Sequence, residues 1–481
     1  MPLVAGIDCS TQSTKALIVD AESGDVVATG RAEHSVTGAD GARETDPEQW
    51  WEALQIALAQ TGRARDVAAI SVAAQQHGLV VTDDEGRPLR PAVLWNDVRS
   101  AAQAEELIQS LGGAEYAATL IGSVPLAAFT VTSWMWIRDH EPGVAARTRA
   151  VRLPHDWLNE KLTGAATTDR GDVSATGWWS SVTDTYLEEI LQHPRVEIDS
   201  SMLPTVLGPG DCAGQVTAQA AAFLGLREGI PVAAGTGDNP AAALGLGLTE
   251  GETVLSLGTS GTVYTVKSTP TADPSGLVVG LADATGHYLP LACTINCTQA
   301  VDRVAELFGV DRNHVDHPGD VTVMPFFDGE RTPYLPHASA TITGLRHDTT
   351  PAQILGAAYE GAVLSLLKAA ELVTEDSDLG TSPLLLIGGG AKGRAWQDTV
   401  RRLSGRPIIV PSVVELVAIG AAAQAAGLLH RQPAVDVAAS WDTRRGERHD
   451  AATRDDERIE RMNDALSRAE PLFGSRSTSL R

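Results

Sequence analysis

The chain has 481 residues, a formal net charge of −24 and 4 cysteines. Its length exceeds what one hydrophobic core usually supports, so two domains are expected. The negative charge argues against nucleic acid as the main partner, because a phosphate backbone would be repelled. No leader or membrane-spanning segment is expected, and so few cysteines make no disulfide scaffold. The composition therefore favours a cytoplasmic, reduced protein.

The first elements in the chain predict a mixed α/β domain. Short apolar runs predict strands at residues 3–9, 15–20 and 25–31. An Asp-Pro pair at residues 46–47 is typical of a helix start, and this helix should continue to about residue 60. A buried strand is expected at residues 67–72, and it leads to a polar segment.

A second opening of the same kind appears in the middle of the chain. Residues 251–257 and 263–266 should form strands, joined by a Ser/Thr-rich turn at residues 258–262. Residues 7–14 and 15–19 have the same order, which makes a weak internal repeat and suggests a duplicated domain. The expected domains are residues 1–245 and 246–440, followed by a peripheral tail at residues 441–481.

Strands and helices are also expected near the end of the chain. A strand at residues 383–387 precedes a Gly-rich turn and a helix that continues to about residue 403. Another strand at residues 407–410 precedes an Ala-rich helix at residues 415–429. The last 40 or so residues are charged and lack strand patterns, so they predict a peripheral helix with a frayed end.

The two hairpin tips are candidates for phosphate binding. No G-x-x-x-x-G-K-[ST] loop is present in the sequence. Tips rich in Ser, Thr and Gly expose N–H groups and hydroxyls that can surround phosphate oxygens. Asp8 lies beside the first tip, where its carboxylate could hold Mg²⁺. Ordinary tight turns use the same residues, so a single tip would not decide between the two interpretations.

The segment Gly235–Pro240 contains a candidate catalytic base, Asp238. It follows an apolar strand at residues 231–234, and its small residues would let two ligands approach closely. Phosphoryl transfer to a hydroxyl needs a group that accepts the proton, and an Asp suffices. The alternative is an Asx turn, because Asp-Asn-Pro is strongly turn-forming.

A set of polar residues after apolar runs suits a polyhydroxylated ligand. Amide, imidazole, carboxylate and guanidinium groups can read hydroxyls, and Trp95 offers an apolar wall for one face of a sugar. A lone histidine such as His77 is more often structural. The set comprises Gln75, Gln76, His77, Trp95, Asn96, Asp97 and Arg99.

The Gly-rich segment GGGAKG at residues 388–393 formally satisfies the dinucleotide fingerprint G-x-G-x-x-G. Glu415 follows as the acidic residue of that pattern. An NAD-dependent oxidoreductase is therefore the alternative from another enzyme class. Fewer than 100 residues remain after the segment, which leaves little room for further βα units, so proximity to a nucleotide is the better interpretation.

The ordered motifs of the chain resemble the FGGY family of carbohydrate kinases, over residues 6–427. They are GIDCSTQSTK, QQHG, LWNDVR, TGDN, LGTSGT, GERTPY and GGGAKG, together with the stretch at residues 340–360. The resemblance implies two ribonuclease-H-like domains of the actin, hexokinase and Hsp70 type, which flank a central cleft for ATP and a sugar. It also implies ATP-dependent phosphorylation of a ketopentose, with D-xylulose as the expected sugar.

The resemblance also implies the roles of individual residues. Asp238 would be the base, and Asp8 and Asp238 would hold Mg²⁺. The sugar would contact Gln76, His77, Asp238 and Asn239, to which the apolar wall offered by Trp95 adds a fifth expected contact. ATP would contact Ser10, Thr11, Gln12, Ser13, Thr14, Lys15, Gly258, Thr259, Ser260, Gly261, Gly389, Gly390, Ala391 and Lys392. Beyond these ligands the expected partner is a second copy of the chain in a homodimer, to which no residue is assigned.

Two departures from the family pattern bear on which sugar is bound. Many bacterial members have Met-His where this chain has Gln76-His77, and Ser133 stands where a Lys is usual. A ribulokinase or another kinase of ketoses therefore remains an alternative. Glycerol kinase fits less well, since its Arg-Glu pair is replaced here by His77-Gly78. A sugar sensor without turnover is disfavoured by the presence of both Asp8 and Asp238.

Overall fold

The computed structural model describes residues 1–375 and 380–473, and contacts within the chain divide it into two units. Unit 1 comprises Met1–Leu248, Lys267–Leu289 and Val413–Thr443. Unit 2 comprises Thr249–Val266, Pro290–Ser412 and Arg444–Arg481. The segment Val413–Thr443 thus packs with unit 1, although most of it was expected in the domain at residues 246–440. The expected domain limits stay a prediction.

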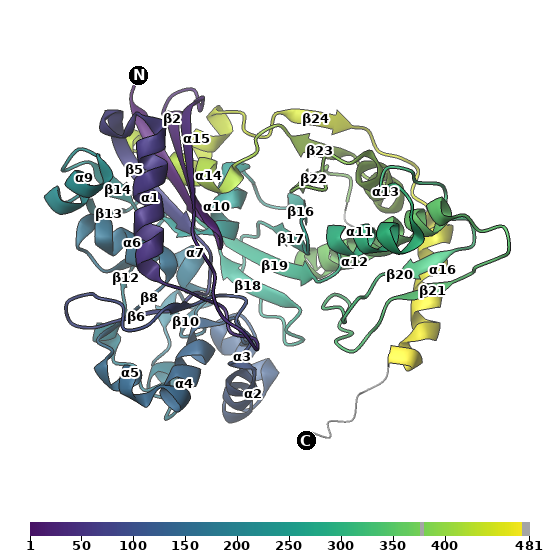
Figure 1. Ribbon diagram of the computed structural model, residues 1–481, viewed down its shortest axis with the longest axis horizontal. Coiled ribbons are helices and arrows are strands. Elements are labelled where there is room, and N and C mark those ends of the chain that lie inside the picture. The colour runs from purple at the N-terminus through teal and green to yellow at the C-terminus, as the bar shows by residue number, and fades with distance from the viewer. Residues whose placement is uncertain (376–379, 474–481) are drawn as a thin grey trace. The chain divides into compact units, whose positions relative to one another are not determined.

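A seven-stranded sheet forms the centre of unit 1 (Figure 1). Its order is β13-β14-β5-β1-β2-β3. The short strand β15 also pairs with β5, nearer the carboxyl end of β5 than β14 does. Strands β1, β2 and β3 are antiparallel neighbours, whereas β1 and β5 are parallel. The strands span Leu3–Cys9 (β1), Ser13–Asp20 (β2), Val26–Glu33 (β3), Val67–Ala74 (β5), Cys212–Gln215 (β13), Pro231–Ala233 (β14) and Thr236–Gly237 (β15).

Alternate residues of β1 point to opposite faces of this sheet, as strand geometry requires. Ile7 lies in a core with Trp50 of α1 and Trp157 of α6, on one face. Val4 lies in a second core, with Ala422 of α14 on the other face. The sheet is therefore covered on both sides, and the apolar strands that the sequence predicts are buried between helices.

The sequence explains where α1 begins and ends and why α14 can pack closely against β1. Asp46 caps α1, because its side chain accepts a hydrogen bond from the Glu48 amide at 3.1 Å, and Gly62 ends it in a left-handed conformation. Helix α14 lies very close to β1, since a Cβ on Gly6 would lie 2.0 Å from the Ala418 carbonyl oxygen. Only glycine fits there.

The other elements of unit 1 complete its layers. The helices span Pro47–Thr61 (α1), Ala101–Ser110 (α2), Ala114–Ile121 (α3), Thr130–His140 (α4), Pro142–Arg147 (α5), Pro154–Thr163 (α6), Arg170–Val173 (α7), Glu188–Leu191 (α8), Ala218–Leu224 (α9), Asp238–Gly245 (α10), Leu416–His430 (α14) and Ala434–Ser440 (α15). Short 3₁₀ turns lie at Ala64–Asp66 and Ser200–Met202. The remaining strands assigned to this unit span Glu44–Thr45 (β4), Val80–Thr82 (β6), Ala92–Val93 (β7), Ala150–Arg152 (β8), Thr167–Asp169 (β9), Trp179–Ser180 (β10), Thr185–Tyr186 (β11), Thr205–Leu207 (β12) and Val278–Ala282 (β18).

The central sheet of unit 2 repeats the strand arrangement of unit 1. Its order runs β19-β17-β16-β22-β23-β24, with antiparallel pairs up to β16 and parallel pairs from β16 to β23. The strands span Thr253–Leu257 (β16), Gly261–Thr265 (β17), Tyr288–Thr294 (β19), Leu384–Ile387 (β22), Ile408–Pro411 (β23) and Gly446–His449 (β24). The internal repeat and the ribonuclease-H-like topology expected from the sequence are therefore confirmed.

Helices pack against this sheet, with the long α12 in contact with β17 and β20 (Figure 1). They span Thr298–Phe308 (α11), Pro351–Thr374 (α12), Arg394–Ser404 (α13) and Asp456–Ala469 (α16), and a 3₁₀ turn lies at Glu470–Phe473. A hairpin joins Thr322–Met324 (β20) to Thr341–Thr343 (β21). No helix in residues 1–375 or 380–473 has both the length and the apolar character needed to cross a membrane.

The last 40 residues differ from the expectation in one respect. Residues 446–449 form the strand β24, although no strand was expected there, because an edge strand pairs through its backbone and tolerates charged side chains. The expected peripheral helix is α16. The end of the chain that was expected to fray falls at residues 474–481, outside the described residues.

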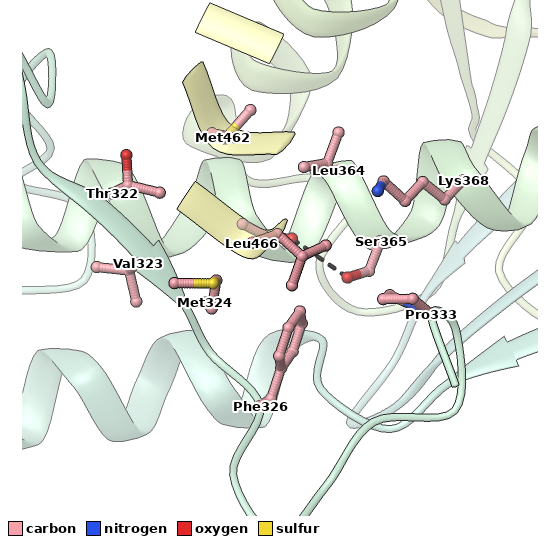
Figure 2. A pocket seen from close by; sticks show the side chains of 11 residues that line it. Thr322, Val323, Met324, Phe326, Pro333, Leu364, Ser365, Lys368, Met462 and Leu466 are labelled. Atoms are coloured by element: carbon pink, nitrogen blue, oxygen red, sulfur yellow. Dashed lines mark hydrogen bonds between the residues drawn. The ribbon is translucent and has the colours of Figure 1, made fainter. Parts of the chain in front are cut away.

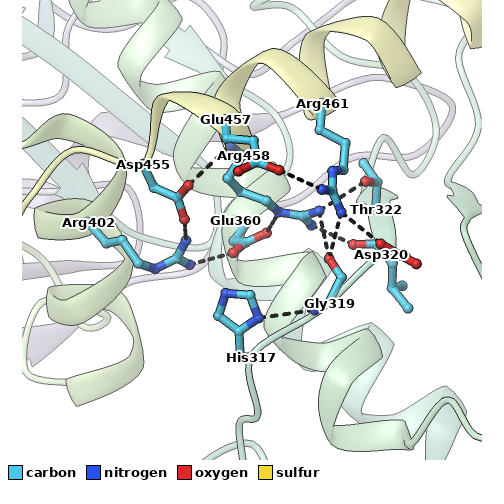
Figure 3. A network of polar contacts seen from close by, with 11 residues as sticks. His317, Gly319, Asp320, Thr322, Glu360, Arg402, Asp455, Glu457, Arg458 and Arg461 are labelled. Carbon is cyan, nitrogen blue, oxygen red and sulfur yellow. Dashed lines mark hydrogen bonds and ion pairs between the residues drawn. The ribbon is translucent and has the colours of Figure 1, made fainter.

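A buried carboxylate joins α16 to the rest of unit 2 (Figure 3). Glu360 of α12 is fully buried and forms ion pairs with Arg402 of α13 and Arg458 of α16. Asp455, at the start of α16, pairs with Arg402 at 2.8 Å. Arg402 therefore contacts both the Glu360 carboxylate of α12 and the start of α16. Helix α16 is therefore anchored by charge as well as by apolar contacts.

Candidate functional site

The carboxyl ends of β1, β5 and β15 meet at one edge of the unit 1 sheet. Asp8 of β1 lies beside Ala73 of β5, and Thr236 of β15 also pairs with Ala73. Asp8 is therefore level with Thr236, and Asp238 follows two residues later. In α/β sheets, ligands bind outside the carboxyl ends of parallel strands.

Asp238 is the first residue of α10, rather than part of an isolated Asx turn. Its Oδ1 accepts hydrogen bonds from the Asn239 amide at 2.8 Å and from Asn239 Nδ2 at 3.0 Å. Burial, followed by the negative charge of Asp8, raises the pKa of Asp238 to about 7. A carboxylate with this pKa is suited to accept a proton near neutral pH.

Gln76 and Asn239 lie in hydrogen-bond contact beside the carboxylate of Asp238. Asn239 Nδ2 donates to Gln76 Oε1 at 3.0 Å. Gln76 Nε2 in turn faces the carbonyl oxygen of Gly171 at 3.4 Å. Gly237 has no side chain, and a Cβ there would lie 2.4 Å from Gln76 Cγ, so this close packing requires the glycine. The structure thus brings together three of the residues expected at the sugar site.

His77 has a backbone conformation that is rare for a residue with a side chain. Its φ is 67°, in the left-handed region, and such strain is often kept at functional positions. The Nδ1 atom lies 2.8 Å from the carbonyl oxygen of Ala175, and the ring stacks on Phe129 with centroids 5.2 Å apart. Both contacts fix the orientation of the ring.

Among the polar residues at 95–99, Trp95 has an exposed ring, whereas Asp97 and Arg99 form an ion pair. Trp95 is 45% exposed, and its Nε1 donates to Thr11 Oγ1 at 3.0 Å, so its ring lies beside the first hairpin tip. Asp97 is buried and accepts from the Arg43 amide at 2.8 Å and from Arg99. Asp97 and Arg99 thus have structural partners, which the sequence could not reveal.

In the first hairpin tip Gln12 is exposed and Ser10 and Thr11 are half-buried, whereas Ser13 and Thr14 are buried. The Thr14 hydroxyl faces Cys9 Sγ at 3.4 Å. The exposed part of the tip fits the expected contact with phosphate. The side chains of the two buried residues face the protein instead.

Asp8 is nearly fully buried at the base of this tip. It accepts a hydrogen bond from Ser10 Oγ at 2.6 Å and lies 3.4 Å from Lys15 Nζ. Lys15 also pairs with Glu415 at 2.6 Å. Burial raises the pKa of Asp8, while Ser10 and Lys15 lower it. Because the charges of Asp8 and Asp238 repel each other, a hard divalent cation bound by their oxygens would relieve that repulsion, and the donor set fits Mg²⁺.

In unit 2 the second hairpin tip contacts the Gly-rich turn and the start of α11. The Gly258 carbonyl oxygen accepts from the Thr298 amide at 3.1 Å and from Thr298 Oγ1 at 2.8 Å. The Gly390 amide donates to the Leu257 carbonyl oxygen at 2.9 Å. Two segments about 130 residues apart in the sequence, both expected to bind nucleotide, thus lie together within this unit.

The Gly-rich turn connects β22 to α13, as the sequence predicted. Gly389 and Lys392 are exposed, whereas Gly390 and Ala391 are buried. A Cβ on Gly390 would lie 2.9 Å from Leu257 Cβ and from Thr298 Cγ2. The sheet beside the turn contains the antiparallel strands β16, β17 and β19, which does not match the parallel sheet of a dinucleotide-binding fold.

Sequence reasoning missed two buried groups near these segments. Glu330 accepts hydrogen bonds from the amides of Ile295 at 2.6 Å and Asn296 at 3.1 Å, and so orders the turn before α11. The pair His155 and Asp172 lies behind the segment that carries Asp238. Neither group has a distinctive spacing in the sequence, because its partners come from distant segments.

A small cavity elsewhere in unit 2 is not a candidate for the sugar (Figure 2). Figure 2 shows mostly apolar side chains around it, among them Met324, Phe326 and Leu466. Its volume is about 10 Å³, which is room for a single water molecule at most. It is a packing defect between α12, α16 and the β20 hairpin.

Comparison with known families gives two matches that together cover most of the chain. Residues 3–245 match the N-terminal domain of the FGGY family of carbohydrate kinases. Residues 253–428 match the C-terminal domain of the same family.

Individual relatives agree with the family match. The chain is 59% identical over 473 residues to the xylulose kinase of Streptomyces coelicolor, covering 98% of this chain and 97% of that protein. The crystal structure of xylulose kinase from Bifidobacterium adolescentis has a TM-score of 0.84 at 35% identity, covering 96% of this chain and 99% of that one. The structure from Rhodospirillum rubrum gives 0.88 at 25% identity, with coverages of 98% and 99%.

Proposed function

Because the chain belongs to the FGGY family of carbohydrate kinases, we propose that it transfers the γ-phosphoryl group of ATP to D-xylulose. The products are D-xylulose 5-phosphate and ADP. The observation that carries this proposal is the position of Asp238, with its raised pKa, beside Gln76 and Asn239. The similarity to proteins named xylulose kinase, at 57% and 59% identity over nearly the whole chain, supports the choice of sugar.

Asp238 acts as the base in this mechanism. As the sugar O5 forms a bond to the γ-phosphorus, the bond from that phosphorus to the β,γ-bridging oxygen breaks, and ADP leaves. The O5 proton passes to the carboxylate of Asp238, which later releases it to solvent. Positioning supplies most of the rate in phosphoryl transfer, and the base is needed late.

Four further residues hold the sugar in unit 1. Gln76 and Asn239 offer amide groups to its hydroxyls, and His77 offers its imidazole from a fixed orientation. Trp95 is exposed and provides an apolar surface for one face of the sugar.

ATP binds through the two hairpin tips and the Gly-rich turn. The first tip contributes Ser10 to Lys15, the second Gly258 to Gly261, and the turn Gly389 to Lys392. Asp8 and Asp238 would hold Mg²⁺. When bound, this ion neutralises negative charge on the transferred phosphoryl group.

We also propose that the protein acts in the cytoplasm, as its composition and few cysteines favour. A homodimer is the assembly we expect. Size-exclusion chromatography with light scattering would decide between this assembly and a monomer.

A coupled assay of ADP release tests the proposed reaction. D-xylulose, D-ribulose, L-ribulose, glycerol and gluconate are compared at equal concentrations, each with ATP and Mg²⁺. The highest kcat/KM is expected for D-xylulose. A higher value for either ribulose would change the sugar but keep the reaction, and no activity on any ketose would reject the proposal.

A further inference from the structure

His155 is a fully buried histidine in the first turn of α6, and both of its ring nitrogens face acceptors. Nδ1 lies 2.7 Å from Oδ2 of Asp172, and Nε2 lies 3.3 Å from the carbonyl oxygen of Ala234. A neutral imidazole donates from one nitrogen only. Because neither acceptor can donate when Asp172 is ionised, this geometry fits the doubly protonated, positively charged ring.

Three buried carboxyl groups surround this ring. Asp156 Oδ1 lies 3.3 Å from Nδ1, and Asp169 is on the segment that also carries Asp172. Burial alone would lower the pKa of His155, but Asp156 and Asp172 raise it to about 10. The cluster His155, Asp156 and Asp172 is compact enough to suggest a metal site. A ring that donates from both nitrogens has no lone pair for a metal ion, so a buried ion pair is the better description.

The ion pair lies directly behind the segment that leads to Asp238. The Ala234 carbonyl oxygen accepts from His155 Nε2 and also from Asn159 Nδ2 at 2.8 Å. Gly235, the next residue, is left-handed with a φ of 76°, and a Cβ there would lie 2.8 Å from His155 Cδ2. The path of the chain toward Asp238 is therefore set against the imidazole ring.

The partner carboxylate belongs to a segment that contacts the sugar-binding residues. Asp169 caps α7 and accepts a hydrogen bond from Thr236 Oγ1 at 2.7 Å, two residues before Asp238. In the same segment, the Gly171 carbonyl oxygen faces Gln76 Nε2, and the Ala175 carbonyl oxygen lies 2.8 Å from His77 Nδ1. Residues 169–175 thus contact both sides of the proposed site.

We propose that the protonated His155 and Asp172 form a positioning pair, which holds the catalytic segment before Asp238 in register with the residues that bind the sugar. The pair touches neither the sugar nor the reacting atoms. It acts through the Ala234 carbonyl group on one side and through residues 169–175 on the other. The role of the pair in catalysis rests on the proposed function. The positive charge of His155 is independent of that function.

Histidine side-chain NMR on ¹⁵N-labelled protein tests the charge without any measurement of activity. The His155 signal is assigned by its loss in His155→Gln. At pH 8 it should show the two equivalent nitrogen shifts of an imidazolium. A neutral His155 at pH 8 would overturn the proposal.

Kinetics then test the positioning role. His155→Gln and Asp172→Asn should each lower kcat/KM for the sugar by about 10- to 100-fold. The Kd of ATP should stay within about twofold, because the pair contacts none of the three segments proposed to bind nucleotide. The double variant should lose little more than the larger single loss, since the two residues act as a unit. His140→Gln, an exposed histidine in the same unit, is the control and should be unchanged.

Circular dichroism gives the folded fraction, to which every rate is scaled. If the His155 or Asp172 variants do not fold, Thr236→Val decides, because it removes only the bond to Asp169 and should also lower kcat/KM. Normal kcat/KM in the folded variants would contradict the positioning role. A wild-type chain without activity on any ketose would instead reject the proposed function, while the NMR result would still stand.

Discussion

The side-chain amide of Asn239 lies between two oxygens, 3.0 Å from Asp238 Oδ1 and 3.0 Å from Gln76 Oε1. This bridge connects the start of α10 with the segment after β5, which are more than 160 residues apart in the sequence. It holds the proposed base and the amide of Gln76, which is proposed to bind the sugar, in one geometry.

Asn239→Ala should therefore lower kcat/KM for D-xylulose by about 10- to 100-fold, because both neighbours lose the group that orients them. Steady-state kinetics with varied sugar would measure this loss. Asn313→Ala, an exposed asparagine of unit 2, should behave as the wild type. An Asn239→Ala enzyme with normal kcat/KM would show that the bridge does not matter.

The raised pKa of Asp238 predicts how activity depends on pH. A base must be deprotonated, and the pKa of Asp238 is about 7, so kcat/KM should fall about tenfold per unit as the pH drops below that value. A profile that stays flat from pH 5 to 8 would contradict the assignment of the base.

Substitutions at two adjacent glycines of the Gly-rich turn distinguish a role in nucleotide binding from a role in folding. At Gly389 an added Cβ meets nothing within 4 Å, whereas at Gly390 it would lie 2.9 Å from Leu257 Cβ. Gly389→Ala should leave the free energy of unfolding within about 0.5 kcal/mol, yet raise the Kd of ATP. Gly390→Ala should lower the free energy of unfolding by about 1–3 kcal/mol.

Denaturant titrations and calorimetric titration with ATP would measure these quantities. Gly389→Ala is the informative variant, because its methyl group meets no other part of the protein and would affect a nucleotide bound at the turn. Unchanged affinity for ATP in Gly389→Ala would remove this turn from the nucleotide site.

The buried carboxylate of Glu360 predicts how firmly α16 is attached. Glu360→Ala leaves Arg402 and Arg458 without their shared partner, so the free energy of unfolding should fall by about 3–5 kcal/mol. Glu457→Ala removes an exposed partner of Arg461 and should cost less than about 1 kcal/mol. Equal losses in the two variants, measured by urea unfolding, would mean that the Glu360 network in Figure 3 does not hold α16.

Local pattern was enough to predict much of the fold. The strands Leu3–Cys9 and Thr253–Leu257 and the helix Pro47–Thr61 lie close to where apolar runs and an Asp-Pro cap predicted them. The strand Gly446–His449 was not predicted, because its charged side chains hide an element that is held by backbone pairing to β23. Edge strands carry no apolar signal of this kind.

The sequence allowed hypotheses about single residues of the candidate site, but not about contacts between residues from distant segments. Asp238 and Gln76 were singled out by their position after strands, and the structure places both at the same edge of one sheet, while their roles stay a prediction. The bond that His155 makes to Asp172 could not be found, because it depends on two helices that meet only in the folded chain. Asp97, which was expected among the polar residues that suit a sugar, is paired with Arg99 and accepts from the distant Arg43 amide.

The central claim is that Asp238 accepts the proton of the sugar hydroxyl, and a single-turnover measurement on Asp238→Asn tests it most directly. The variant keeps the size of the side chain but removes the base. With saturating D-xylulose, ATP and Mg²⁺, phosphoryl transfer should slow by about 10²- to 10⁴-fold, while ATP still binds. Transfer at the wild-type rate in Asp238→Asn would contradict the account.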